Sequence, residues 1–157
     1  MTLQATFVHV NLAAEDWRRL SAFYERVFGC LPVPPERHYR GEALERLTGV
    51  PTVKLRGVHL RLPGAGPDGP TLEIFEYDPL VERMPTTVNR PGYRHLAFAV
   101  SDVQRAREEV LDHGGRSLGG VETFTIDTGD QVTTAYVTDP EGNIIELQSW
   151  QPAGDTP

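Results

Sequence analysis

The sequence contains very little cysteine and no long apolar segment. Only one of its 157 residues, Cys30, is a cysteine. A disulfide framework within the chain and a zinc site built from thiolates are therefore both excluded. No apolar run approaches the roughly 18 residues needed to span a bilayer. The first residues also lack the basic segment and apolar stretch of a secretory signal, so we expect a cytoplasmic protein with no membrane partner.

Positive charge is also scarce. The chain has 15 lysines and arginines against 22 aspartates and glutamates, which gives a formal net charge of −7 with histidine neutral. Nucleic acids and anionic membranes are bound by positively charged surfaces, so neither is expected as a partner. Apolar residues make up 39% and charged residues 24% of the chain, a composition typical of a soluble globular protein. A small-molecule ligand is the remaining kind of partner.

The two halves of the sequence are related to each other. Residues 7–16 (FVHVNLAAED) have a counterpart in residues 93–102 (YRHLAFAVSD), with the histidine and the final aspartate at matching positions. Each aspartate precedes a helical pattern, at the place of an N-cap. The periodicity predicts helices over 17–28, ending at Gly29, and over 103–111, ending at Gly114 and Gly115.

Each half then ends in a predicted hairpin. Strands 58–62 and 71–77 flank a loop rich in proline and glycine, and strands 133–138 and 143–150 flank the turn 139–142. Further strands are expected near 52–55 and 121–126. Residues 32–51 are interpreted as an insertion that carries a short helix over 42–47.

The element order is therefore βαβββ, twice. This order predicts an α+β fold built from two βαβββ modules. We predict one domain over residues 1–157. Its expected parts are module 1 at about 5–78, a linker at 79–91, module 2 at about 92–150 and a tail at 151–157.

The alternation of side chains along the strands singles out a set of polar residues. Apolar residues such as Val8, Val10 and Leu12 share the face that is expected to meet the helices. The polar residues at intervening positions then point to the opposite face. They are His9 and Glu73 in the first half and His95 and Glu146 in the second.

Each of these residues alone also has an ordinary explanation. A strand histidine is commonly exposed, and a glutamate in an apolar strand can be satisfied by an ion pair to Arg56, Arg61 or Arg94. Because the same pair recurs in both halves, we favour a metal site. Two neutral imidazoles and two carboxylates around a divalent cation give a neutral inner shell, and nitrogen and oxygen ligands without thiolate suit Zn, Ni, Co, Mn or Fe(II).

Five segments carry a resemblance to a known family. They are 7–10 (FVHV), 23–29 (FYERVFG), 72–75 (LEIF), 94–100 (RHLAFAV) and 139–146 (DPEGNIIE). In these segments the sequence resembles the vicinal oxygen chelate superfamily, which includes glyoxalase I, methylmalonyl-CoA epimerase, extradiol dioxygenases and bleomycin-resistance proteins. The resemblance covers about residues 5–150. It implies that the paired βαβββ modules form one curved mixed sheet, an open cup with the helices on its outer face, around one metal ion.

The resemblance also implies a ligand set. Glyoxalase I-like enzymes use His or Gln, Glu, His and Glu, which His9, Glu73, His95 and Glu146 match in order. The epimerase has Gln where Glu73 stands. Extradiol dioxygenases use only a His-His-Glu triad, which would leave Glu73 surplus, and bleomycin-resistance proteins generally lack the ligands.

The implied activity is that of a divalent-metal-dependent lyase or isomerase. It transfers a proton α to a carbonyl through a metal-stabilised enolate, with Glu146 or Glu73 as the base. One alternative is an Fe(II)-dependent extradiol-type dioxygenase. Another is a non-catalytic, resistance-type protein that binds a small molecule. Members of the superfamily differ in whether the cup is completed within one chain or shared across a dimer, and we expect a homodimer.

Strand alternation places further residues on the cup side. His59 and Arg61 are candidates to contact an anionic substrate, although an exposed strand surface is the alternative. Aromatic residues that line the cup, or simply pack in it, are Phe75, Tyr77 and Tyr136. Bacterial glyoxalase I typically has an arginine and an asparagine four residues after its first two ligands. This chain has Ala13 and Tyr77 there, so glutathione is not the implied substrate.

Overall fold

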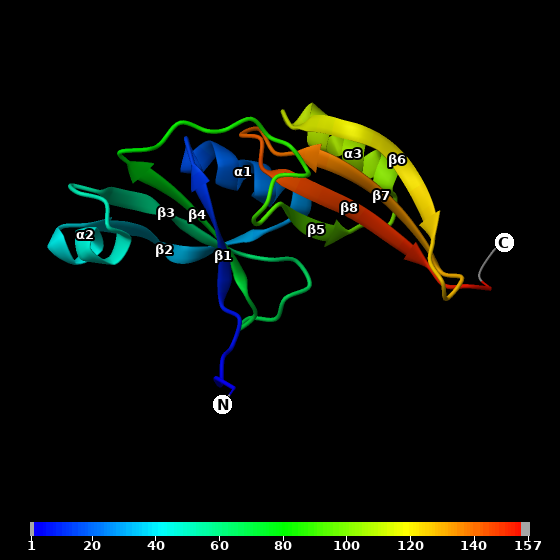
Figure 1. Cartoon of the computed structure of the whole chain (residues 1–157), viewed down its shortest axis with the longest axis horizontal. Coiled ribbons are helices and arrows are strands. Elements are labelled where there is room, and N and C mark those ends of the chain that lie inside the picture. Colours follow the sequence, from blue (N-terminus) through cyan, green and yellow to red (C-terminus); the bar gives the residue numbers. More distant parts are fainter. Residues whose placement is uncertain (1, 155–157) are drawn as a thin grey trace. The chain divides into compact units, whose positions relative to one another are not determined.

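The computed structural model describes residues 2–154. The chain divides into two compact units, with the boundary between Arg83 and Met84. The first unit contains β1 (His9–Ala14), α1 (Trp17–Phe28), β2 (Leu31–Arg40), α2 (Glu42–Thr48), β3 (Lys54–Arg61) and β4 (Thr71–Asp78). The second contains β5 (His95–Ala99), α3 (Val103–Asp112), β6 (Arg116–Thr125), β7 (Gln131–Thr138) and β8 (Ile144–Gln151) (Figure 1). Within residues 2–154, no helix is long and apolar enough to cross a membrane.

Each unit is built on a four-stranded mixed sheet. The strand orders are β1-β4-β3-β2 and β5-β8-β7-β6. In both sheets the first strand is parallel to the last strand of its unit, and the remaining neighbours are antiparallel. The repeated order confirms the predicted α+β fold of two βαβββ modules.

The two predicted aspartate caps are present. The Asp16 side chain accepts hydrogen bonds from the backbone N–H groups of Arg18 and Arg19, and the Asp102 side chain accepts one from that of Arg105. These acceptors satisfy N–H groups that have no partner within the helix. Helix α1 ends at Gly29, whose φ of 67° is in the left-handed region that glycine adopts without strain. The helices predicted over 17–28 and 103–111 are thus confirmed.

One face of each sheet is buried by a helix. In the first unit α1 packs on β1, β3 and β4, and Leu60, Leu72 and Ile74 are fully buried. In the second unit α3 packs on β6, β7 and β8, where Ile145 and Leu147 are fully buried. Residues at the intervening positions of these strands therefore lie on the opposite face, as the alternation predicts.

The prediction for residues 32–51 and 52–55 is wrong in part. Residues 31–40 form strand β2, and the segments 52–55 and 58–62 belong largely to one strand, β3. Proline rarely occurs in a strand because it has no N–H to donate, but β2 is an edge strand, and its pairing with β3 shifts between Val33 and Arg37. Val8 was expected to face the helices, yet it precedes β1 and is 63% exposed.

Helix α2 matches the short helix predicted over 42–47 but packs on the other face of the sheet. Its Leu44 lies in a buried cluster with Val53, Leu55 and Phe75, and Tyr77 packs against this cluster. Phe75 and Tyr77 share the face of Glu73. One end of this face is therefore covered by α2, in contrast to the prediction that all helices lie outside the cup.

Candidate functional site

Three strands of the first unit bring polar side chains to Glu73. In the parallel pair of β1 and β4, Asn11 lies opposite Glu73 and His9 lies opposite Thr71. In the antiparallel pair of β3 and β4, His59 lies opposite Glu73. The strand registers alone thus place two imidazoles and one amide around a single carboxylate.

The contacts of Glu73 use both of its carboxylate oxygens. Asn11 Nδ2 donates a hydrogen bond to Oε2 at 2.9 Å, and His9 Nε2 lies 3.6 Å from the same oxygen. His59 Nε2 lies 3.0 Å from Oε1. The Glu73 side chain is only 12% exposed, and these contacts offset the cost of removing the carboxylate from water.

His59 is held in one orientation by its neighbours. Its Nδ1 lies 3.1 Å from Thr71 Oγ1, and the Phe75 ring meets the imidazole edge-on, with ring centroids 5.7 Å apart. Burial lowers the pKa of His59 from 6.5, while the charge of Glu73 opposes this change. The neutral imidazole, which is the form that binds metals, is therefore favoured at neutral pH.

His9, His59 and Glu73 have the geometry of a metal site. One ligand atom from each residue can be chosen so that all three lie within 4.8 Å of one another. Two imidazoles and a carboxylate are suitable donors for first-row transition ions. The sequence predicted His9 and Glu73 as ligands, whereas it predicted His59 only as a substrate contact.

The second unit repeats part of this arrangement around Glu146. His95 Nε2 lies 3.0 Å from Glu146 Oε2, and Thr134 Oγ1 donates a hydrogen bond to Oε1 at 3.0 Å. Tyr136 lies opposite Glu146 in the register of β7 and β8, and its ring centroid is 5.4 Å from that of His95. Burial, and then the charge of Glu146, raise the pKa of Tyr136, so its phenol stays protonated at neutral pH.

Arg56 and Arg94, which were proposed as alternative partners of the strand glutamates, bind other groups. Arg56 Nε donates to Glu76 at 3.1 Å, and Arg94 Nε donates to the backbone oxygen of Tyr93. Arg61 shares the face of His59. Its Nε is buried and has no hydrogen-bond partner among the described residues.

The predicted aromatic contacts differ in exposure. Phe75 is buried against Leu44 and Leu55, whereas Tyr77 and Tyr136 keep part of their surface exposed. Asn11 and Thr134, which hold the two carboxylates, were missed in the sequence. The position of Asn11 could have been predicted from the sequence, because it follows His9 by two residues and so shares its strand face.

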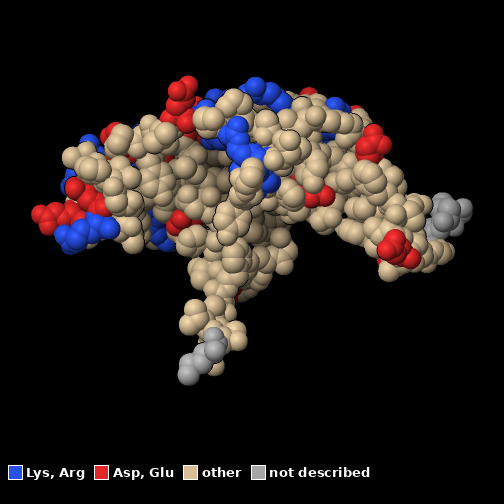
Figure 2. Space-filling model, viewed as in Figure 1, with Lys and Arg blue, Asp and Glu red and all other residues tan. Residues whose placement is uncertain are grey.

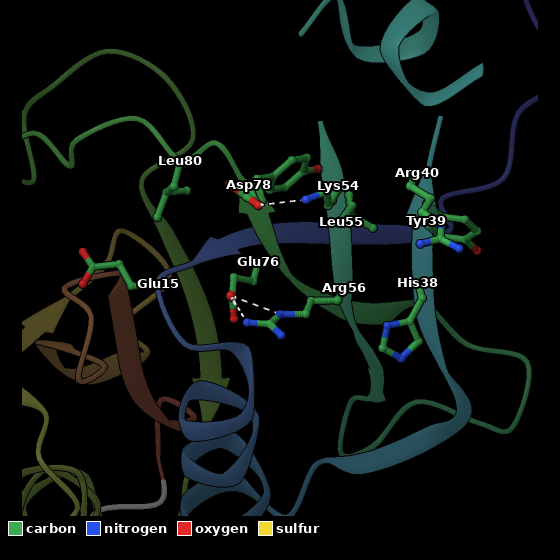
Figure 3. A pocket seen from close by; sticks show the side chains of 11 residues that line it. Glu15, His38, Tyr39, Arg40, Lys54, Leu55, Arg56, Glu76, Asp78 and Leu80 are labelled. Carbon is green, nitrogen blue, oxygen red and sulfur yellow. Dashed lines mark hydrogen bonds and ion pairs between the residues drawn. The ribbon is translucent and has the colours of Figure 1, made fainter. Parts of the chain in front are cut away.

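A second feature of the first unit is a pocket of about 750 Å³. Figure 3 shows it between the ends of β2, β3 and β4, with Arg56 bound to Glu76 and Lys54 Nζ 3.6 Å from Asp78. The residues that line this pocket include none of His9, His59 and Glu73, so it is separate from the histidine cluster. Four of its charged side chains pair with one another. On the face shown in Figure 2, acidic and basic side chains are interspersed.

A comparison with protein-family models found a match over most of the chain. The sequence model of the Glyoxalase/Bleomycin resistance protein/Dioxygenase superfamily matches residues 6–147. A search of curated proteins gave no significant match.

Solved structures of glyoxalase-family proteins share the fold. A glyoxalase family protein from Bacillus cereus has 21% identity and a TM-score of 0.69, with 96% of this chain and 95% of that chain covered. A glyoxalase/bleomycin resistance protein/dioxygenase family enzyme from Burkholderia phytofirmans has 15% identity and a TM-score of 0.56, with 92% and 98% covered. A glyoxalase I variant from Zea mays has 19% identity and a TM-score of 0.59, with 90% of this chain and 45% of that chain covered.

Proposed function

The chain belongs to the Glyoxalase/Bleomycin resistance protein/Dioxygenase superfamily, and from this premise we propose that it is a divalent-metal-dependent enzyme that moves a proton next to a carbonyl group. The observation that carries the proposal is the recurrence of one His–Glu pair per unit. His9 and Glu73 on β1 and β4 correspond to His95 and Glu146 on β5 and β8. We propose that these four residues share one cation.

The donor set fits a divalent transition ion. Two carboxylates balance the charge of the ion, and two imidazoles supply neutral nitrogen ligands. Zn, Ni, Co, Mn and Fe(II) all accept such a set. A bound cation of this kind would polarise the substrate carbonyl and stabilise the negative charge that develops on its oxygen when the neighbouring proton leaves.

The two glutamates differ in how firmly they are held, which bears on the choice of base. Glu73 receives a hydrogen bond from Asn11 and has His59 and His9 at its two oxygens. Glu146 is contacted by Thr134 and His95. Because it has fewer fixed contacts, we propose Glu146 as the residue that accepts the proton and returns it, with Glu73 as the more rigid ligand.

The environment of Arg61 indicates that the substrate is a small anion. Its guanidinium has a buried Nε without a hydrogen-bond partner in the described part of the chain, and leaving such a donor unpaired is costly. A carboxylate or another anionic group of the substrate would pair with the Arg61 guanidinium and would orient the carbonyl. Substrates of this class include 2-oxo acids and acyl compounds that carry an anionic group.

We also propose that the protein acts as a homodimer in the cytoplasm. Strand β1 is at an edge of its sheet, and Phe7 and Val8 just before it are 66% and 63% exposed. An exposed edge with apolar neighbours is a common place for another chain to pair. Light scattering on the purified protein at several concentrations tests the dimer.

The proposed reaction is tested by hydrogen exchange. Metal-loaded protein is incubated in deuterated water with a panel of 2-oxo acids and acyl thioesters, and the loss of the α-proton signal is followed by NMR. We expect exchange with at least one compound, loss of exchange in Glu146→Gln, and full activity in the surface control His38→Gln. If no compound exchanges faster than with the unfolded protein, the proposal is contradicted. Oxygen uptake with a catechol would instead indicate the Fe(II) dioxygenase. If a chelator removes the metal and the protein still binds a small molecule without altering it chemically, the protein is non-catalytic.

A further inference from the structure

The cluster around Glu73 has one imidazole more than the cluster around Glu146. His59 lies opposite Glu73 in the register of β3 and β4, and Tyr136 lies opposite Glu146 in the equivalent register of β7 and β8. The two units repeat the same strand order. They therefore differ in chemistry at one matched position, where the first unit has a strong metal ligand and the second has a protonated phenol.

His59 is arranged to offer its Nε2 atom. Nδ1 lies at hydrogen-bonding distance from Thr71 Oγ1, 3.1 Å, and Nε2 faces Glu73 Oε1 at 3.0 Å. When Nδ1–H donates to the hydroxyl, Nε2 presents a lone pair toward a carboxylate oxygen. In this tautomer one cation can bind Nε2 and Oε1 together, whereas in the other tautomer Nε2–H donates to Oε1. A hydrogen bond to the second ring nitrogen is also the usual way in which proteins orient a histidine ligand.

The contacts of Asn11 and His9 are compatible with His59 as a metal ligand. Asn11 Nδ2 donates a hydrogen bond to Glu73 Oε2 at 2.9 Å, and the other carboxylate oxygen, Oε1, faces His59. The rings of His9 and His59 meet edge-on, with centroids 5.7 Å apart, and their ligand atoms satisfy the 4.8 Å spacing together with Glu73. His9 is more exposed than His59, with 40% of its side chain accessible against 19% for His59. A cation can therefore enter from the His9 side.

We propose that His59 is a metal ligand, so that His9, His59 and Glu73 bind a divalent transition ion without any ligand from the second unit. This inference rests on the proposed function in placing a metal at Glu73. It goes further because it assigns a coordinating role to a residue outside the four-ligand set. Three protein ligands leave open positions for the two oxygens of a substrate or for ligands from the second unit.

The test removes the second unit's ligands from the full-length chain. In the variant His95→Ala/Glu146→Ala, calorimetric titration with Zn²⁺ measures stoichiometry and affinity. Pulsed EPR of the Cu²⁺-loaded protein counts the imidazole rings bound to the metal. We expect one Zn²⁺ per chain and two coordinated imidazoles. Adding His59→Gln is expected to weaken Zn²⁺ binding by about tenfold or more and to leave one imidazole.

Controls keep the two proposals distinguishable. His38→Gln, an exposed histidine on β2, should change neither the affinity nor the count. Circular dichroism checks folding. If the triple variant does not fold, His59→Gln alone is used, and the imidazole count should fall from three to two.

No Zn²⁺ binding by the double variant, while the wild-type protein binds, overturns the role of His59 and leaves the four-ligand proposal standing. An unchanged imidazole count after loss of His59 does the same. Absence of metal binding by the wild-type protein contradicts both proposals.

Discussion

Asn11 Nδ2 donates a hydrogen bond to Glu73 Oε2 at 2.9 Å, and the two residues are direct register partners on the parallel strands β1 and β4. The same pair of strands thus supplies a proposed ligand and the group that orients it. In the second unit the residue opposite Glu146 on β5 is Ala97, and the hydrogen bond comes from Thr134 on β7 instead. The two glutamates are therefore fixed from different sides.

Replacing Asn11 by alanine should weaken metal binding more than it weakens the fold. The variant removes one donor to a carboxylate that is only 12% exposed, and loss of an orienting contact typically costs about 10- to 100-fold in metal affinity. The cost in stability should be about 1 kcal/mol, the usual contribution of one hydrogen bond. Zn²⁺ titration and urea unfolding measure the two effects. An unchanged affinity would show that Asn11 does not position Glu73.

The hydroxyl of Thr134 should matter for turnover rather than for substrate binding. Thr134 Oγ1 donates to Glu146 Oε1 at 3.0 Å, so Thr134→Val removes the donor while keeping the shape of the side chain. We expect the rate of α-proton exchange to fall by about tenfold with KM nearly unchanged, because the proposed base loses its orientation. Thr134→Ser keeps the hydroxyl and should restore the rate. Equal losses in both variants would indicate a packing effect instead.

Much of this site could be predicted from the sequence because it depends on local rules. Strand alternation placed His9, Glu73, His95 and Glu146 on the face opposite the helices, and the aspartates that begin α1 and α3 are standard caps. These inferences need only the identity of neighbouring residues.

The contact between His59 and Glu73 could not be predicted in the same way. It depends on the register between β3 and β4, and a slip by one residue would move His59 to the other face. The loop between these strands, residues 62–70, gives no sequence rule that fixes the register. Strand β2 was missed for a related reason. Its prolines argue against a strand unless the strand is known to lie at a sheet edge, which only the fold reveals.

Cys30 should be almost unreactive in the folded protein. It is buried, and desolvation, with a smaller effect from the charge of Glu25, raises its pKa from 9.0 to about 11. At pH 8 this rise lowers the thiolate fraction about 100-fold, and the thiolate is the form that iodoacetamide attacks. We expect slow alkylation of the native protein and rapid alkylation in urea, followed by mass spectrometry.

The same shift has a consequence for stability at alkaline pH. Well below pH 9 the thiol is protonated in both the folded and the unfolded chain, so Cys30 causes almost no pH dependence there. Between pH 9 and about 11 only the unfolded chain ionises, and the free energy of unfolding should fall. Replacement of Cys30 by alanine should make this part of the stability profile flatter. An equally steep fall in the variant would assign the effect to other groups.

The site also depends on a glycine that has no chemical function. Gly57 lies opposite Phe75 in the register of β3 and β4, and a Cβ atom at Gly57 would collide with the backbone oxygen of Ile74 and the Phe75 ring. The Phe75 ring in turn lies 5.7 Å from the His59 imidazole. Gly57→Ala should therefore destabilise the protein by about 1–3 kcal/mol, the usual cost of overpacking.

A matched control separates this clash from the general effect of adding a methyl group. A Cβ at Gly66 in the loop before β4 would meet no atom within 4 Å, so Gly66→Ala should change stability by less than about 0.5 kcal/mol in either direction. Urea unfolding of both variants tests the difference. Because the displaced ring supports His59, Gly57→Ala should also weaken Zn²⁺ binding in the folded protein, whereas Gly66→Ala should not. Equal stabilities of the two variants would show that Phe75 moves aside without cost, and equal Zn²⁺ affinities would show that its packing does not orient His59.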